Sequence, residues 1–234
     1  MNADGRRSLL SILLLLAVAV APAVPAPAAA QERKIEPVDE AGKDASWNAF
    51  RKRLFDTLEK RDRKQLLSIV SSGVRNGSDS PRGVAEFRKQ WAIDDDDSPI
   101  WSALRSALSL GSAWFVREKK QRELCAPYVL AKWPEDVDFR TNGVIVAREA
   151  LAKSAPTSGS ETLATLAYQI VPVSDWELDD TDKASKQKWV KIRLNERDAY
   201  VPEEQIRSPI EHAACFIKTE FGWRLTVFGP AGRD

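Results

Sequence analysis

The residue types that most often carry enzyme chemistry are few in this chain. It holds one histidine, His212, and two cysteines, Cys125 and Cys215. Nucleophilic catalysis by serine or cysteine needs a histidine within hydrogen-bond reach of the nucleophile. His212 instead follows Glu211 at an expected strand start, which is typical of a surface residue. A structural zinc site takes about four nitrogen or sulfur ligands, so these residues are too few. We expect no catalytic residues, no metal and no cofactor, and therefore no enzyme.

Carboxylates are abundant, but their spacing favours no particular reaction. Asp94 to Asp97 form a run that could offer oxygen ligands to calcium. The run lacks the alternating ligands and the glycine of a calcium loop, which favours a solvated acidic loop. Glu135, Asp136 and Asp138 could supply a pair for glycoside cleavage, which needs two acids placed across a cleft. The sequence does not single out such a pair.

The first thirty residues predict export. Arg6 and Arg7 precede an apolar run that ends in small residues, and Ala28 to Ala30 provide a cleavage motif. This is the pattern of a secretory signal peptide, and the apolar run is too short to span a bilayer. We expect cleavage between Ala30 and Gln31, with a cut after Ala28 as the second choice. The paired arginines leave a twin-arginine signal as an alternative to the general secretory route. The protein is predicted to be periplasmic or secreted, without stable membrane insertion after cleavage.

Export has consequences for charge and for the cysteines. Cleavage removes Arg6, Arg7 and Asp4 from 35 basic and 34 acidic residues, which leaves a mature chain without net charge. Such a chain is not steered toward nucleic acid. In an oxidising compartment an isolated cysteine pair favours a disulfide between Cys125 and Cys215. Two separately buried thiols are the alternative.

The first half of the mature chain is predicted to be helical. Residues 31–45 are charged and lack apolar periodicity, which predicts a flexible leader. Asp62 is placed to cap a second helix, and Ser98 a fourth with proline at its first position. A turn is expected over residues 73–83 and a third helix after it. The first helix presents one apolar stripe, formed by Trp47, Phe50, Leu54 and Leu58.

The chain changes character after Gly111. Residues 113–116 and 125–133 are apolar and rich in aromatic and β-branched side chains, which favours strands. Over residues 189–194 the aliphatic side chains of Val190, Ile192 and Leu194 alternate with those of Trp189, Lys191 and Arg193, which is the period of two of a strand. Residues 213–218 and 223–228 are predicted to form a closing hairpin. The fold class is therefore α+β, with an N-terminal helical or α+β domain over residues 46–141 and a hairpin within residues 208–234.

A series of weak motifs occurs in a characteristic order between residues 142 and 207. They comprise Val144, Val146 and Arg148, then residues 155–158 and 163–166, then Trp189 to Ile192, and finally Ala199 to Val201. In this order they resemble the bacterial SH3-like domain family. The resemblance implies a small five-stranded β-barrel. Lys188 stands where the family has a glycine, and residues 175–188 form a longer, more charged segment.

The SH3-like resemblance also implies a ligand site. Aromatic side chains in this family lie at or near a peptide groove, which places Trp189 and Tyr200 at that groove with Tyr168 and Trp176 at its border. Exposed aromatic side chains offer a large contact area at low entropic cost. Packing inside a small barrel explains Trp189 equally well.

The remainder of the chain resembles a second family more faintly. Residues 50–75 and the closing hairpin, with Phe216 and Trp223, are similar to SnoaL-like (nuclear-transport-factor-2-like) domains, in which helices precede a curved sheet. This implies that the barrel is inserted into the first domain, with both cysteines in one sheet. A helical first domain with an appended barrel is the simpler arrangement.

These observations lead to one functional expectation with two alternatives. We expect an exported, non-catalytic protein whose SH3-like barrel contacts a peptide, a cell-wall component or an envelope protein. One alternative is a SnoaL-like enzyme or small-ligand binder with a pocket in the first domain. The other is a purely structural envelope protein. The sequence leaves the oligomeric state open.

Overall fold

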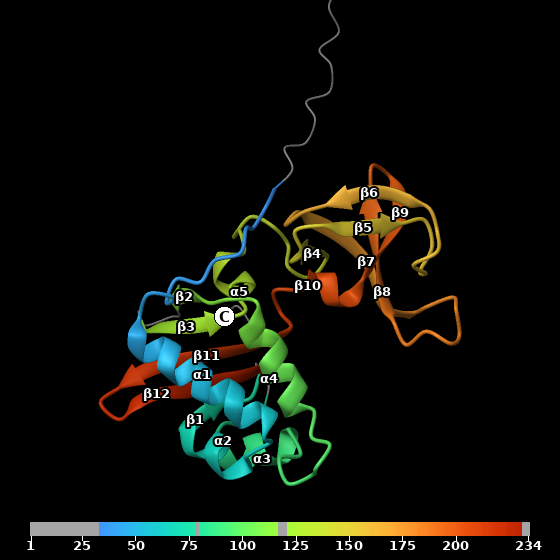
Figure 1. Cartoon of the computed structure of the whole chain (residues 1–234). Coiled ribbons are helices and arrows are strands. Elements are labelled where there is room, and N and C mark those ends of the chain that lie inside the picture. The colour runs from blue at the N-terminus through green and yellow to red at the C-terminus, as the bar shows by residue number, and fades with distance from the viewer. Residues whose placement is uncertain (1–32, 78–79, 117–120, 231–234) are drawn as a thin grey trace, which may run out of the picture. The chain divides into compact units, whose positions relative to one another are not determined.

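The structure, a computed structural model, describes residues 33–77, 80–116 and 121–230. The predicted signal peptide, with its expected cleavage point between Ala30 and Gln31, lies outside these residues. The described chain forms two β-sheets with helices grouped on the first (Figure 1). The class is α+β, as the sequence predicts. No helix in the described ranges is long and apolar enough to cross a membrane.

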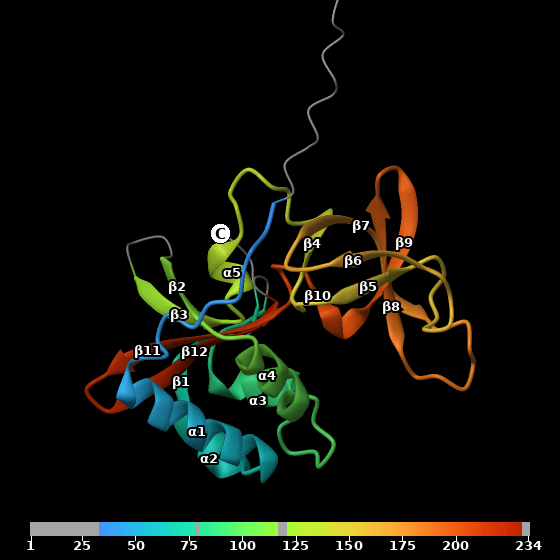
Figure 2. The same ribbon diagram turned by 45° about the horizontal axis from the view of Figure 1, so that its top comes forward.

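The first sheet has five strands from both ends of the described chain. Its order is β1-β12-β11-β3-β2, with β1 at Val70–Arg75, β2 at Ala113–Val116, β3 at Arg122–Ala126, β11 at His212–Thr219 and β12 at Gly222–Pro230. Figure 2 shows α1 to α4 on one side of this sheet and α5 on the other. The helices are α1 at Ala45–Glu59, α2 at Arg63–Ile69, α3 at Val84–Gln90, α4 at Ile100–Ser109 and α5 at Val129–Lys132.

Local signals explain where the helices start. Asp44 caps α1, because its Oδ1 accepts hydrogen bonds from the backbone of Ser46 at 2.7 Å and Trp47 at 3.2 Å. Asp62 caps α2 through the backbone N–H of Gln65, as predicted. α4 begins at Ile100 with Pro99 at its N-cap, one residue later than predicted from Ser98, although the Ser98 hydroxyl oxygen accepts from the backbone of Ile100 at 3.4 Å. The four residues of the predicted α1 stripe are all buried in the main core.

The segment predicted as an extended run over residues 125–133 is only partly a strand. β3 ends at Ala126, and α5 begins at Val129 after two intervening residues. Pro127 has no N–H and cannot continue a strand ladder. The backbone of Lys132 then bonds to the Tyr128 carbonyl at 3.0 Å. The strand is therefore followed by a short helix, whose Leu130 packs against Cys125 and Cys215.

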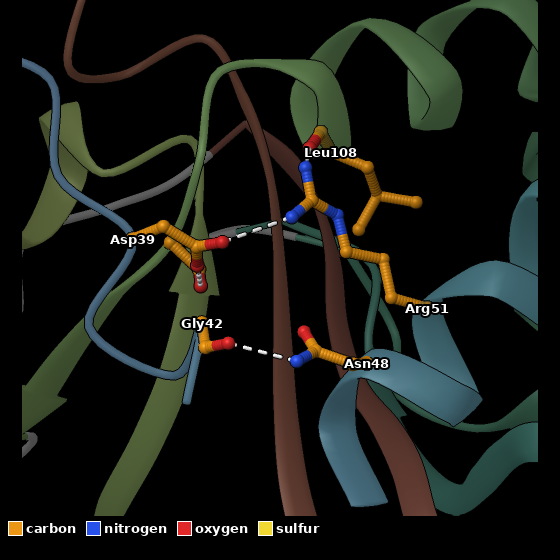
Figure 3. Close-up of polar contacts among 6 residues, drawn as sticks. Asp39, Gly42, Asn48, Arg51 and Leu108 are labelled. Atoms are coloured by element: carbon orange, nitrogen blue, oxygen red, sulfur yellow. Dashed lines mark hydrogen bonds and ion pairs between the residues drawn. The ribbon is translucent and has the colours of Figure 1, made fainter. Parts of the chain in front are cut away.

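Residues 33–44, expected as a flexible leader, instead pack along the folded chain, and we call them the N-terminal strap. Ile35 is buried, and its N–H bonds to the Tyr168 carbonyl at 2.9 Å. Arg51 of α1 donates to Asp39 at 3.0 Å and to the Leu108 carbonyl at 3.0 Å (Figure 3). The few apolar residues of the strap lie singly among charged ones and form no periodic pattern. The sequence therefore gave no sign of these tertiary contacts.

The strap also explains a glycine. Gly111 has a φ of +81°, and a Cβ there would lie 2.4 Å from the carbonyl oxygen of Val38. Only glycine allows the strap to approach the end of α4 this closely. A glycine with positive φ directly after the helix is also a common way to end it, and Gly111 follows the C-cap residue of α4.

The second sheet has seven strands in the order β10-β4-β7-β8-β9-β5-β6. The strands are β4 at Asn142–Ile145, β5 at Ala150–Lys153, β6 at Thr162–Leu166, β7 at Ile170–Asp179, β8 at Lys188–Leu194, β9 at Arg197–Pro202 and β10 at Ile206–Arg207, with a 3₁₀ turn η2 at Glu203–Gln205. The turn between β8 and β9 forms at Asn195 and Glu196, both with positive φ. β10 and β6 are the two end strands of this sheet and do not pair with each other among the described residues. Hydrogen bonds therefore do not close the sheet into a barrel.

The second sheet is an insertion between two neighbouring strands of the first. β3 and β11 pair antiparallel, with Cys125 opposite Cys215 and Ala126 opposite Ala214. The chain between them forms α5 and the whole second sheet. The closing hairpin thus completes the first sheet, as the inserted arrangement requires, and the appended arrangement is not the one observed. The predicted disulfide joins Cys125 and Cys215.

Candidate functional site

The four aromatic residues implied by the SH3-like resemblance do not share one surface. Trp189 is only 2% exposed, and its indole N–H donates to Asp180 at 3.1 Å. Burial acts to raise the pKa of Asp180, but hydrogen bonds from the Asp182 backbone and from Trp189 help to outweigh it and lower the pKa. Trp189 therefore anchors the loop before β8 and does not offer its ring to a ligand.

The other three residues lie at separate places. Trp176 is half-buried against the core of the second sheet. Tyr200 lies on β9 opposite Lys191 and Lys153. Tyr168 occupies the turn between β6 and β7, where its carbonyl accepts the strap hydrogen bond. Tyr168, Trp176 and Tyr200 keep partial exposure, but no pocket described below is lined by them.

The acids and the histidine considered for chemistry serve structural contacts. Asp94 pairs with Arg88 and Asp96 with Arg63, both at 2.6 Å, which agrees with a solvated acidic loop. The His212 ring lies 5.0 Å from the ring of Trp91. Burial, with a smaller effect of Arg207, lowers the pKa of His212.

Of the three acids considered for glycoside cleavage, two make contacts within their own part of the chain. Asp136 pairs with Arg33 at 2.6 Å. Asp138 accepts from the Arg140 backbone at 2.9 Å and from the Thr141 hydroxyl at 3.1 Å. Glu135 is exposed.

The interior of the first domain is filled by aromatic side chains. The Trp47 ring lies 5.2 Å from Phe216 and 5.0 Å from Trp223, and Trp91 lies 4.5 Å from Phe228. A SnoaL-like enzyme would need an open pocket in this place. Beside this packing the described residues leave one smaller pocket of about 200 Å³, lined by α1, α2 and the closing hairpin, so the alternative of a ligand pocket in the first domain stays a prediction.

Glu123 is a buried carboxylate that sequence reasoning missed. Its side chain is fully buried, accepts from Arg75 at 2.6 Å and Thr226 at 2.7 Å, and lies near the disulfide. The two sulfurs are bonded to each other and are not free thiolate ligands. The Glu123 carboxylate and Arg75 therefore form a buried ion pair beside the Cys125–Cys215 disulfide, and the bonded sulfurs offer no thiolate to a metal.

One end strand of the second sheet, β6, lies on a pocket. Within the described residues β6 pairs with β5 alone. A pocket of about 470 Å³ lies along β6 and reaches the β8–β9 turn, where Leu194, Asn195 and Arg197 line it. Leu163 borders the pocket and is 40% exposed. We call this feature the β6 edge pocket.

Two of the other sheet edges, those of β2 and β10, are covered or short. β2 is bounded by the strap, because the Trp114 N–H donates to the Glu40 carboxylate at 2.7 Å and the Glu40 N–H to the Ser112 carbonyl at 2.8 Å. β10 has only two residues. β6 contains no charge and no proline over its five residues, although these are the usual means of protecting an exposed edge. This lack of charge was the one sequence signal that could have identified the edge.

Comparison with known proteins adds no assignment. No protein-family model matches the chain, and no curated protein and no solved structure is detectably similar to it.

Proposed function

We propose that this protein is an exported, non-catalytic binding protein whose second sheet is an open SH3-like barrel that binds an extended peptide at β6. The observation that carries the proposal is the unpaired β6 edge lying directly on a pocket. An extended peptide can add to such an edge as a further strand, with main-chain hydrogen bonds giving affinity and side-chain pockets giving specificity.

The lining of the β6 edge pocket indicates the chemistry of the peptide. Leu163, Leu166 and Leu194 give it an apolar wall. Arg197 also lines the pocket and is exposed, with no ion pair among the described residues. Successive side chains of a bound strand point to opposite faces, so alternate residues of the peptide reach the pocket. One of these residues is apolar and contacts the leucines, and a neighbouring one carries a carboxylate that pairs with Arg197.

Several observations support export and a non-catalytic role. A disulfide across neighbouring strands suits an oxidising compartment, in agreement with the predicted signal peptide. The candidate catalytic residues make structural contacts, and the first domain is packed with aromatic rings. The partner class is therefore a peptide segment of an envelope protein or of the cell wall, met in the periplasm or outside the cell.

Peptide selection followed by site-directed variants tests the proposal. The mature protein is screened against a displayed library of random peptides, and the affinity of a synthetic selected peptide is measured by fluorescence anisotropy. Leu163→Asp places a charge at the pocket and is expected to weaken binding at least tenfold. Leu151→Asp is the matched control, because Leu151 is also 40% exposed and lies on the neighbouring β5 but does not line the pocket.

Hydrogen exchange locates the bound peptide independently. Amides of residues 162–166 are expected to become protected when the peptide binds, since an added strand pairs with them. Equal weakening by Leu163→Asp and Leu151→Asp, or protection confined to other strands, would contradict the proposal. Failure to select any peptide above background would favour the purely structural alternative.

A further inference from the structure

A second pocket, of about 510 Å³, lies near the end of the inserted segment. We call it the charged pocket, because six of its lining residues are ionisable, three of each sign: Lys186, Lys188, Arg207, Glu203, Glu204 and Glu211. Its volume falls within the range of small-molecule sites, about 300–1,000 Å³. None of its residues lines the β6 edge pocket.

Several of these charges already have partners. Lys188 pairs with Asp179 at 2.6 Å, and Glu204 accepts from Gln187 at 2.6 Å. Arg207 pairs with Glu211 at 3.1 Å and also contacts the hydroxyl of Ser106 on α4. Burial raises the pKa of Glu211 despite this pair. These contacts hold the side chains of Lys188, Glu204 and Arg207 in place within the lining.

Two opposite charges in the lining have no such partner. Among the described residues, neither the Lys186 ammonium nor the Glu203 carboxylate makes a hydrogen bond or an ion pair. Glu203 is partly buried, and burial together with Glu177 raises its pKa, although Lys188 and Arg207 lie near enough to act in the opposite direction. A partly desolvated carboxylate that accepts no hydrogen bond is further stabilised by a cation that reaches it, and Lys186 offers the complementary site for an anion.

We infer that the charged pocket binds a small zwitterion, a short peptide with free termini, by pairing the ligand ammonium with Glu203 and the ligand carboxylate with Lys186. The lining carries equal numbers of both charges, so it attracts neither simple anions nor simple cations as a class. A ligand with both groups satisfies both unpaired residues at once, and each charge-assisted hydrogen bond adds affinity.

Four matched probes test the inference on the mature protein. The dipeptide alanyl-alanine carries both charges, its N-acetyl form lacks the ammonium, its amide lacks the carboxylate, and the form with both ends blocked has neither. Binding is followed by titration calorimetry. The free dipeptide is expected to bind at millimolar concentration or below. Each singly blocked form is expected to bind about tenfold more weakly, and the doubly blocked form more weakly still.

Two variants assign the charges. In Glu203→Gln the free and N-acetylated dipeptides are expected to bind equally, whereas discrimination against the amide is kept. In Lys186→Met the reverse is expected. Glu220→Gln and Lys64→Met, at exposed positions outside the pocket, are the matched controls and should leave all four affinities unchanged.

The wild-type comparison stands even if a variant fails to fold, because it needs the probes alone. No binding of the free dipeptide, equal binding of the blocked forms, or unchanged discrimination in both folded variants would overturn the inference. These results do not depend on Leu163 or on β6, so the two proposals fail separately.

Discussion

Cys125 and Cys215 face each other on β3 and β11, with their Cα atoms 4.0 Å apart. The disulfide therefore joins the two strands between which the second sheet is inserted. It closes a loop with a sequence separation of 90. In effect, the first sheet is covalently tied at the points where the chain leaves it and returns to it.

Replacing both cysteines by alanine is expected to lower the free energy of unfolding by about 4–5 kcal/mol. The reason is that the unfolded chain, no longer closed into a long loop, gains conformational entropy. Urea unfolding of the mature protein measures the change. The control is the same variant with added reductant, which should unfold at the same urea concentration as without it. An unchanged midpoint in the variant would show that the crosslink does not stabilise the fold.

Glu123→Ala is expected to destabilise the first sheet by about 3–5 kcal/mol. The substitution leaves Arg75 half-buried without its carboxylate partner, and breaking a buried ion pair from one side has this cost. Thermal or urea unfolding provides the measurement. Glu220→Ala, on the exposed hairpin turn, serves as the control and should stay within about 0.5 kcal/mol of wild type. A similar small effect for Glu123→Ala would argue against the buried pair.

Trp189→Phe is expected to reduce stability in a pH-dependent manner. Asp180 has a pKa below its ordinary value of 3.8, so the stability that it contributes is present above that pH and is lost as the pH falls through the folded-state pKa. Because the variant removes one hydrogen bond that lowers this pKa, its deficit should be full at pH 7 and smaller at pH 3. Urea unfolding at both values measures it.

Asp180→Asn is the control for this pH dependence. It removes the titrating carboxylate, so Trp189→Phe made in that background should show the same deficit at both pH values. A deficit in Trp189→Phe alone that does not change with pH would count against the role given to the Trp189–Asp180 hydrogen bond.

Arg51→Met is expected to loosen the N-terminal strap without unfolding the protein. The change removes the hydrogen bonds to Asp39 and to the Leu108 carbonyl (Figure 3), which are partly exposed and together contribute about 1–2 kcal/mol. Amide exchange should accelerate over residues 33–44 more than in α1. Arg53→Met, on the exposed side of the same helix, is the matched control; equal acceleration in both variants would refute the assignment.

Local signals in the sequence were sufficient for most elements. The Asp62 cap, the stripe of α1 and the alternation in β8 all depend on neighbours within a few residues, and each formed where it was predicted. The disulfide was predicted from the compartment and from the small number of cysteines. These features require no knowledge of distant parts of the chain.

What the tertiary structure decided involves residues far apart in sequence. Glu123 meets Arg75 and Thr226 only after β1, β3 and β12 have come together, and Ile35 is buried in a cluster with residues 128 and 144. The Trp189 indole bonds to Asp180, in a segment that the sequence could describe only as long and charged. No periodic pattern records such pairings.

By itself, then, the sequence determined the α+β class, the start of α2 and the disulfide, because each follows from composition or short-range spacing; the export signal, outside the described residues, stays a prediction. Only the tertiary structure decided that the second sheet is inserted between β3 and β11, that β6 keeps a free edge and that Lys186 and Glu203 line one pocket. The physical reason is that strand order and burial are set by long-range packing, which brings together residues whose separation along the chain carries no signal.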